Sequence, residues 1–508
     1  MSAAIGAQWA ANTNYQGIIC VGHSMGCLLL RKAYVYGRGQ IDDSPLANEG
    51  TTGAEPSEWV RHVDRFVLLA GTNRGWSLEK KPQGMHFWTA FLFHIGKFFG
   101  RLTGTARLIL SCEHGEPFIA NLRIQWIRTG RSGTTQMRVP LVIQLLGDED
   151  DIVSNQDSMD VAVSRDFLWI PVFNTGHSSV INFHEPGIGK DREQKFMLTL
   201  GTGEDIETLR RMALRPQRQE DPDVKALVFV MHGIRDNAEW TATLETPLQR
   251  AYQVAHPGKT NNLVVERSRY GFFAMGPFLL WGDRQRNVRW FMDLYTEDLA
   301  RYPNLEEIDF VGHSNGTYLL ASALERYRAF KINRVVFAGS VVRMNYPWHA
   351  MAGRIDGIRN YTASADWVVG IFPHLFETRG FRWINKDLGA AGFYGFLEAF
   401  GSANETKFIN GTHFSALEPT NYPSVVDFIV SNKTSNVTGL VVASPCAFVD
   451  YSSRLCFVWW FLLIGILVGG GFLFVRGVTR QASGHRLIVA IVCTFLYLSV
   501  ILLILCSI

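Results

Sequence analysis

A short glycine-rich phrase occurs twice in this chain, at residues 22–26 (GHSMG) and at residues 312–316 (GHSNG). Each copy follows an apolar, strand-like run and precedes a helix-like run. A serine at the tip of a tight strand-to-helix turn takes a strained backbone conformation, and flanking glycines let the chain close around it. Such a turn exposes the hydroxyl beside a helix N-terminus, where backbone N–H groups favour negative charge. The repeat therefore predicts two similar halves, built around Ser24 and Ser314.

The second half alternates apolar strand-like runs with helix-like runs. The strand-like runs lie at 226–234, 262–271, 308–314, 332–340, 358–364 and 405–411. Short apolar strands that alternate with helices are typical of a parallel sheet with both faces covered. Ligands of such sheets bind outside the C-terminal ends of the strands.

The first half has fewer strand-like runs, at 17–21, 63–75, 139–147 and 166–173. It has no strand before 17–21 and no counterpart of His232-Gly233. We therefore predict an α/β chain with two doubly wound, mostly parallel sheets, of which the first lacks its N-terminal strands. Three explanations are open: a truncated gene product, a domain completed by a partner, or a degenerate domain.

Changes in composition suggest the boundaries between domains. The stretch 212–224 is charged and contains proline, which is typical of a linker. We predict a first domain at 1–212, a linker at 213–223, a second domain at 224–440 and a membrane anchor at 450–508.

The predicted anchor contains two long runs without charge. A bilayer core needs about 20 helical residues, and we predict transmembrane helices at 456–475 and 487–507. The loop between them carries Arg476, Arg480 and Arg486. The positive-inside tendency places this loop in the cytoplasm and the globular part on the opposite side. The stretch 1–11 shows no signal peptide, so the side of the globular part stays open.

Charge and cysteine content exclude several classes of function. The net charge is +3 and no basic stripe dominates, which does not suggest nucleic-acid binding. The 7 cysteines lie at irregular spacings, which indicates neither a zinc site nor a disulfide framework. We predict no metal and no cofactor, and we make no prediction of oligomeric state.

A serine hydroxyl becomes a nucleophile when a base takes its proton, a carboxylate orients the base and N–H groups bind the oxyanion. In the second half, Ser314 is followed by Asp366 after one strand-like run and by His413 after the next. Asp356 and His349 are alternatives, but they precede the relevant strand.

The predicted oxyanion donors of the second half are two backbone N–H groups. Asn315 follows the serine, and Ile234 follows His232-Gly233. Both donors have a visible source in this half. We therefore expect the second site to be the more complete one.

In the first half, Ser24 is the candidate nucleophile and His177 the candidate base. The acid is predicted to be Asp150, with Asp151 as second choice, and Asp148 stands in the same acidic loop. The N–H of Met25 is one oxyanion donor. No source of a second donor is visible.

An apolar insert at about 75–138 follows the second strand-like run of the first half. Its stretch 85–104 is rich in aromatic and aliphatic residues, and its polar residues do not gather on one helical face. One interpretation is a lid over a serine site, facing an acyl chain or a membrane surface. The other is an ordinary pair of buried helices.

Both halves resemble the α/β-hydrolase fold superfamily. GHSMG with LLAGTNRG (68–75) resembles the lipase and thioesterase branch, and VFVMHGIRDN (228–237) with GHSNG resembles bacterial and fungal esterase-like hydrolases. The resemblance covers roughly 1–200 and 224–435. It implies that the serine, aspartate and histidine of each half act as nucleophile, acid and base. Cys27 stands where lipases often have glycine, and the front of the first domain is missing.

These observations predict a membrane-anchored serine hydrolase. It would cleave carboxylic esters or thioesters of lipid-like acyl substrates through an acyl-serine intermediate, without a metal. Its predicted partners are an apolar acyl ester and, through the C-terminal hairpin, a lipid bilayer. The alternatives are a catalytically silent, membrane-tethered interaction module, and an amidase or peptidase that uses the same triad.

Overall fold

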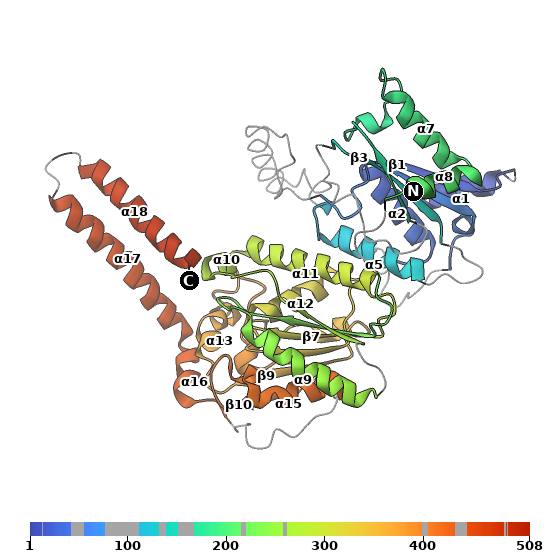
Figure 1. The fold of residues 1–508 in the computed structure, drawn as a ribbon. Coiled ribbons are helices and arrows are strands. Elements are labelled where there is room, and N and C mark those ends of the chain that lie inside the picture. Colours follow the sequence, from blue (N-terminus) through green and yellow to red (C-terminus); the bar gives the residue numbers. More distant parts are fainter. Residues whose placement is uncertain are drawn as a thin grey trace. The chain divides into compact units, whose positions relative to one another are not determined.

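Two compact units make up the chain, each with its own parallel sheet (Figure 1). Unit 1 comprises Met1–Pro222, Arg289–Pro303 and Arg326–Phe330, and unit 2 comprises Asp223–Val288, Asn304–Glu325 and Lys331–Ile508. The computed structural model describes residues 1–12, 14–41, 55–76, 111–131, 139–150, 167–214, 220–257, 262–398, 405–431, 444–481, 484 and 486–507.

The sheet of unit 1 has four strands in the order β1-β2-β3-β4, and all neighbours are parallel. The strands are β1 (Ile18–His23), β2 (Val63–Leu69), β3 (Leu141–Gly147) and β4 (Phe167–Val172). The helices and short 3-10 turns are α1 (Ser2–Ala11), α2 (Met25–Gly37), η1 (Glu58–His62), α5 (Pro117–Arg131), η2 (Ser179–Ile181), α7 (Gly189–Leu200) and α8 (Glu204–Met212).

Helices cover both faces of this sheet. On one face, Tyr34 of α2 and Trp126 of α5 pack against Phe66 of β2. On the other face, Leu209 of α8 joins Ile143 and other buried side chains of the strands. Because helices cover both faces, the strands are mostly apolar, as is typical of a parallel sheet, with exceptions such as Asp64 of β2 and Gln144 of β3.

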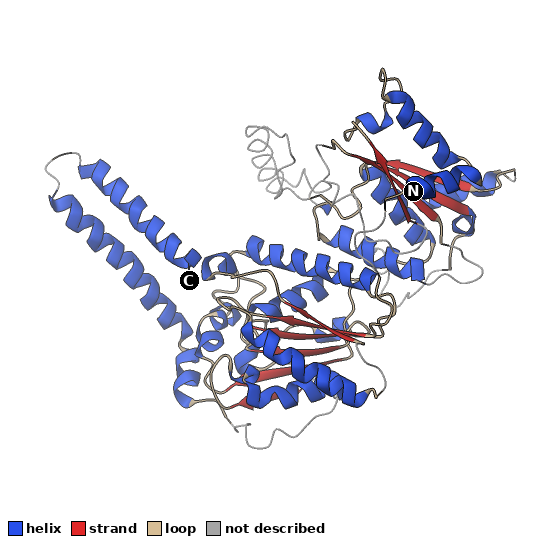
Figure 2. Ribbon diagram, in the orientation of Figure 1, coloured by secondary structure: helices blue, strands red, loops and turns tan. Residues whose placement is uncertain are grey.

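The sheet of unit 2 has six strands in the order β10-β9-β8-β7-β5-β6, again all parallel (Figure 2). The strands are β5 (Ala226–Met231), β6 (Leu263–Arg267), β7 (Glu307–His313), β8 (Arg334–Ala338), β9 (Gly357–Ala363) and β10 (Glu405–Ile409).

The sheet of unit 2 is accompanied by helices and short 3-10 turns. They are α9 (Glu239–Ala255), α10 (Met275–Leu279), the first part of α11 (Trp281–Arg301), α12 (Asn315–Arg326), η3 (Trp348–Met351), α13 (Trp367–Ile371), η4 (Pro373–Glu377), α14 (Ala391–Tyr394), η6 (Ser415–Leu417), η7 (Pro419–Asn421), α15 (Tyr422–Ser431) and α16 (Ala447–Arg454). Buried side chains of α9 and α15 form one core with the strands, and α12 lies on the opposite face (Figure 1).

The predicted parallel α/β architecture is confirmed, and every strand-like run forms a strand. Strands β1, β2, β3 and β4 of unit 1 are adjacent in chain order, and strands β7, β8, β9 and β10 of unit 2 are adjacent in the same way. They differ beside the serine-bearing strand. In unit 2, β7 lies between β8 and β5, whereas β1 is an edge strand of the sheet formed by the described residues of unit 1.

Two apolar helices end the chain, α17 (Cys456–Gln481) and α18 (Arg486–Ser507). One described helix, over Cys456–Arg480, is long and apolar enough to cross a membrane, and the apolar stretch Leu487–Ile501 of α18 is shorter. The two helices contact each other, and the Tyr497 hydroxyl donates a hydrogen bond of 2.7 Å to the Leu467 carbonyl. A membrane-spanning hairpin therefore stays a prediction.

Two of the predicted segments lie mainly outside the described residues. The aromatic stretch 85–104 of the lid is one, and positions 215–219 of the linker are the other. The described helix of the insert, α5, is buried against the sheet of unit 1, so this part of the insert belongs to the core.

Candidate active sites

Each serine sits in a strained turn between a strand and a helix. The φ angle is +54° at Ser24 and +51° at Ser314, a left-handed region that non-glycine residues rarely adopt. The backbone N–H of Ser24 donates to Leu69 at 2.9 Å, and that of Ser314 donates to Ala338 at 3.0 Å. Each serine is therefore held by the next strand of the sheet at the start of a helix.

The glycines of the two turns meet different surroundings. A Cβ on Gly22 would lie 3.0 Å from the Cys27 nitrogen, and one on Gly312 would lie 3.1 Å from the Thr317 nitrogen. Both positions thus need glycine. A Cβ on Gly316 would collide with Met231 of β5, but one on Gly26 would meet nothing within 4 Å.

Unit 1 contains a continuous chain of hydrogen bonds from serine to carboxylate. Nε2 of His177 lies 2.8 Å from Oγ of Ser24, and Nδ1 of His177 lies 3.0 Å from Oδ2 of Asp150. The side chains of His177 and Asp150 are 7% and 4% exposed. With Nδ1–H bound to the carboxylate, Nε2 is free to accept the serine proton.

The acidic loop of unit 1 divides its tasks between neighbouring carboxylates. Asp150 contacts the histidine, whereas Oδ1 of Asp148 accepts the backbone N–H of Thr175 at 3.1 Å. Asp148 therefore shapes the loop that carries His177. The second choice for the acid, Asp151, lies outside the described residues.

Unit 2 brings its predicted acid and base together but leaves the serine apart. Nδ1 of His413 lies 2.8 Å from Oδ2 of Asp366, and Oδ1 of Asp366 accepts the N–H of Val369 at 3.0 Å. Asp366 is fully buried. Among the described residues, no hydrogen bond joins Ser314 to His413. The hydrogen bonding thus favours the first site, opposite to the expectation from the sequence.

A glycine explains where the ring of His413 lies. Gly339 follows the strand residue that binds the Ser314 N–H, and its φ is +55°. A Cβ on Gly339 would lie 2.6 Å from Cε1 of His413, so the ring occupies the space that a side chain would fill. Ala70 stands at the same point of unit 1 with φ +46°, and its methyl group fills that space.

The alternatives in unit 2 lie elsewhere. Oδ2 of Asp356 accepts from the side chain of Asn333 at 2.6 Å in an exposed contact. The side chain of His349 is 73% exposed and lies 3.9 Å from Glu398. Neither residue joins Ser314.

The two predicted oxyanion donors of unit 2 flank the serine. A Cβ on Gly233 would lie 3.4 Å from Oγ of Ser314, so the backbone of this turn approaches the hydroxyl closely. No acceptor is recorded among the described residues for the N–H of Ile234 or of Asn315. Both donors are therefore available to a ligand oxygen beside Ser314.

A tyrosine that the sequence analysis did not single out links these donors. The Tyr270 hydroxyl donates to the carbonyl of His232 and accepts from Nδ2 of Asn315 at 3.4 Å. Its ring stacks on His232 at 4.2 Å between centroids. Burial raises the pKa of Tyr270 and lowers that of His232, so both stay neutral. No local signal marks Tyr270, because it lies after β6 and reaches the site only through the fold.

Unit 1 offers less to an oxyanion. The N–H of Met25 stands at the start of α2, as that of Asn315 stands at the start of α12. No described segment of unit 1 occupies the place that His232 and Gly233 take in unit 2. The first site thus has the complete hydrogen-bonded triad, and the second has both oxyanion donors.

The histidine before each serine has a structural partner. Nε2 of His23 donates to the backbone carbonyl of His177 at 2.8 Å, and Nε2 of His313 donates to that of His413 at 3.3 Å. Burial lowers the pKa of His313 well below its usual range, so its ring is neutral. The same pairing in both units indicates that these histidines hold the loops of the candidate bases.

Cys27 lies near Ser24 but is not a competing nucleophile. Burial raises the pKa of the Cys27 thiol to about 12, so it does not compete with Ser24 as a nucleophile. Among the described residues, no group of three or more His, Cys, Asp or Glu side chains is arranged to hold a metal ion.

No protein-family model matches the chain, and no curated protein matches its sequence. Among solved structures, a cutinase-like protein from Cryptococcus sp. is similar over 42% of this chain and 97% of its own, with 10% identity and a TM-score of 0.25.

A thermophilic esterase from the Planctomycetes species Thermogutta terrifontis, Est2, is similar over 44% of this chain and 86% of its own, with 13% identity and a TM-score of 0.22. Its propionate-bound form is similar over 44% and 90%, with 13% identity and a TM-score of 0.23. At these values the likeness says nothing about the activity of this chain.

Proposed function

We propose that the protein is a membrane-anchored serine hydrolase that cleaves carboxylic esters or thioesters. The observation that carries the proposal is the relay Asp150–His177–Ser24, with hydrogen bonds of 3.0 and 2.8 Å. The positive φ of Ser24 supports it, because strain at a serine in a strand-to-helix turn is typical of an exposed nucleophile.

The chemistry follows from the atoms of the relay. Nε2 of His177 takes the proton from Oγ of Ser24 as Oγ attacks the acyl carbonyl. The same proton then passes to the departing alcohol or thiol, which leaves an acyl-serine. A water molecule attacks this ester in turn and gives its proton to His177. His177 passes that proton to Oγ of Ser24 as the acid departs, which restores the free serine. Asp150 keeps the ring oriented and stabilises its positive charge.

Unit 2 is proposed as a second site of the same kind. The Asp366–His413 pair and the free N–H groups of Asn315 and Ile234 support this proposal. The ring of His413 has to move off Gly339 towards Ser314 before it can take a proton. Hydrogen bonds of this type are often long in unliganded enzymes and shorten with substrate.

The apolar C-terminal end of the protein supports a substrate with an apolar acyl group. The exposed surface of α17 is apolar over most of its length, which suits a membrane-bound enzyme that meets lipid-like esters. We propose anchoring by α17 together with α18.

A fluorophosphonate probe tests the proposal. We expect the probe to label wild-type protein on Ser24 and Ser314, with faster labelling of Ser24 because its proton already has an acceptor. Ser24→Ala should abolish labelling of unit 1 only, and Ser314→Ala that of unit 2 only, as mapped by mass spectrometry. Folded protein that takes up no label would contradict the proposal and favour a catalytically silent interaction module. A panel of ester, thioester and amide substrates then separates esterase from amidase activity.

A further inference from the structure

A single segment of unit 2, residues 378–387 after η4, separates two hollows. Arg382, Lys386 and Asp387 line a polar cavity on one side. Phe381 and Ile384 line an apolar groove on the other. Side chains that alternate along one segment thus place a polar and an apolar hollow next to each other.

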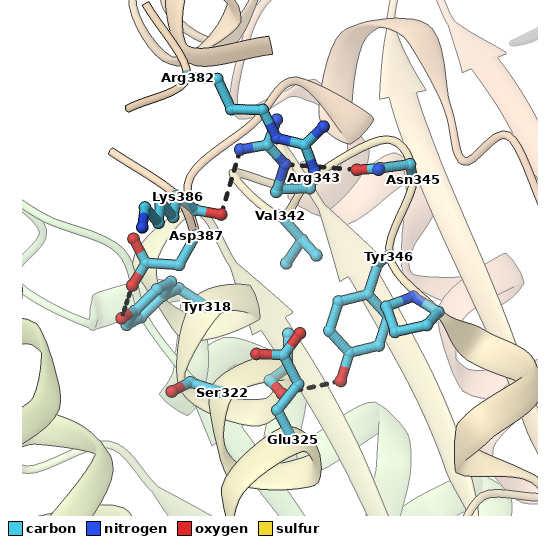
Figure 3. A pocket seen from close by; sticks show the side chains of 12 residues that line it. Tyr318, Ser322, Glu325, Val342, Arg343, Asn345, Tyr346, Arg382, Lys386 and Asp387 are labelled. Atoms are coloured by element: carbon cyan, nitrogen blue, oxygen red, sulfur yellow. Dashed lines mark hydrogen bonds between the residues drawn. The ribbon is translucent and has the colours of Figure 1, made fainter. Parts of the chain in front are cut away.

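Among the described charged side chains that line the polar cavity, the ones without an ion-pair partner are mainly positive. Its volume is about 190 Å³, and its side chains surround it, with Arg343 and Arg382 opposite Glu325 (Figure 3). Among the described residues, no ion pair or hydrogen bond is recorded for the side chains of Arg382 and Lys386.

The other charges of the cavity are already engaged or weakened. Arg343 is paired with Glu377 at 3.0 Å, and Asp387 is paired with Arg284 at 2.9 Å. Burial raises the pKa of Glu325, which makes its negative charge easier to lose. Two unpaired cations, Arg382 and Lys386, therefore line the cavity. Its volume of about 190 Å³ is several times the roughly 30 Å³ that one water molecule takes up, so a phosphate group fits the cavity in charge and in size.

The apolar groove has a volume of about 310 Å³ and lies against the start of α17. Its walls on the helix are Phe457, Trp460, Phe461 and Ile464. Trp460 fixes the helix to the rest of unit 2, since its Nε1–H donates to the Phe372 carbonyl at 3.3 Å.

The groove continues the lipid-facing surface of α17. Phe461 and Ile464 line it and are still 61% and 48% exposed, so the groove opens sideways along the helix. Where α17 enters a bilayer, lipid acyl chains cover this surface. One of these acyl chains can then move from the bilayer into the groove. Trp383 is 74% exposed on the dividing segment, a residue that prefers the membrane interface.

We propose that this segment forms a binding site for one anionic phospholipid. One acyl chain lies in the groove between Ile384 and Phe461, and the phosphate is bound by Arg382 and Lys386 in the cavity. The site rests on the proposed membrane location of α17 and is independent of the serine chemistry. It would hold unit 2 at the membrane surface in one orientation.

The test uses the full chain reconstituted into phosphatidylcholine vesicles that contain a small fraction of phosphatidylglycerol with a diazirine on one acyl chain. We expect light-induced crosslinks on peptides that contain Phe381–Ile384 or Phe457–Ile464. Arg382→Gln with Lys386→Gln should reduce the crosslink yield at least about tenfold, because it removes both charge-assisted contacts to the phosphate.

The matched control is Arg379→Gln with Arg250→Gln, which removes the same charge but lines neither hollow. The control should crosslink like the wild type, and circular dichroism melting shows that both variants are folded. Equal crosslink yields for the two double variants would overturn the proposal. The proposal would also be overturned if inorganic phosphate reduced the crosslink yield as strongly as unlabelled phosphatidylglycerol does. As a second variant, Ile464→Trp should fill the groove and move the crosslinks away from Phe381–Ile384.

Flotation of the vesicles separates this site from the proposed anchor. A chain that floats but gives no crosslink at these peptides refutes the lipid site alone. A chain that does not float refutes the anchor and the site together. Fluorophosphonate labelling is unaffected by either result.

Discussion

The two histidines that precede the serines show how single residues support the sites. Each donates Nε2–H to the backbone carbonyl of the candidate base, at 2.8 Å in unit 1 and 3.3 Å in unit 2. A carbonyl only accepts hydrogen bonds, so the ring must carry its proton on Nε2. His23 and His313 are therefore positioning residues, and they do not touch the reacting atoms.

Replacing His23 by Phe should slow the labelling of Ser24 by a fluorophosphonate about fivefold. The change removes one hydrogen bond worth about 1 kcal/mol and loosens the loop of His177. The rate constant of labelling in the Ser314→Ala background measures this effect. His184→Phe, an exposed position outside the site, is the control. A purely structural role of His23 would lower the melting temperature and leave the rate unchanged.

At the scale of elements, the serine-bearing strands differ in their neighbours. Val21 of β1 is 42% exposed, while Val311, at the same point of β7, is fully buried between β8 and β5. The glycines after the serines agree with this, because only Gly316 abuts a neighbouring strand. The open side of β1 is thus a property of the sheet and not of one residue.

This difference predicts opposite outcomes for one substitution. Val311→Lys buries an unpaired charge in the core that the sheet forms with α9 and α15, and it should destabilise unit 2 by more than about 3 kcal/mol. Val21→Lys keeps its charge in water at a sheet edge and should change stability by less than about 0.5 kcal/mol. Hydrogen exchange of the β7 and β1 peptides measures both in the full chain. Strong destabilisation by Val21→Lys would show that the edge of β1 is covered.

At the scale of the whole molecule, the chain combines two parallel α/β units with an apolar C-terminal end. The most apolar 18-residue stretch of the helix over Cys456–Arg480 has a mean hydropathy of 2.3, and only 6% of that stretch is buried. An exposed helix of that length and composition is what the proposed membrane anchor requires.

Membrane anchoring predicts that the protein resists extraction by alkaline carbonate from the membranes of expressing cells. A chain that ends at Leu455 keeps α16 and loses α17 and α18, and it should be released into the soluble fraction. Full-length protein that carbonate extracts as readily as the shortened chain would exclude an integral membrane helix.

Much of the fold follows from local patterns in the chain. Apolar runs between helix-like segments predict all strands of both sheets, because a strand with both faces covered is predominantly apolar. The strained turns at Ser24 and Ser314 follow from their glycines for a similar reason, since no other residue fits at Gly22 or Gly312.

The sites depended on contacts that local patterns do not show. Three aspartates of one loop were candidates for the acid of unit 1, and only the fold shows Asp150 at His177 and Asp148 at Thr175. The gap between Ser314 and His413 depends on Gly339, which follows the neighbouring strand β8, and Tyr270 reaches Asn315 from the loop after β6.

By itself, the sequence determined the parallel α/β class, the two serine turns and the order of candidate acid and base, because these are properties of neighbouring residues. The tertiary structure alone decided which candidate site has a continuous chain of hydrogen bonds, which has two candidate oxyanion donors, and which hollows adjoin α17. The physical reason is that hydrogen bonds at catalytic distance join side chains from different loops. Their spacing depends on shifts of an ångström, which packing sets and composition does not.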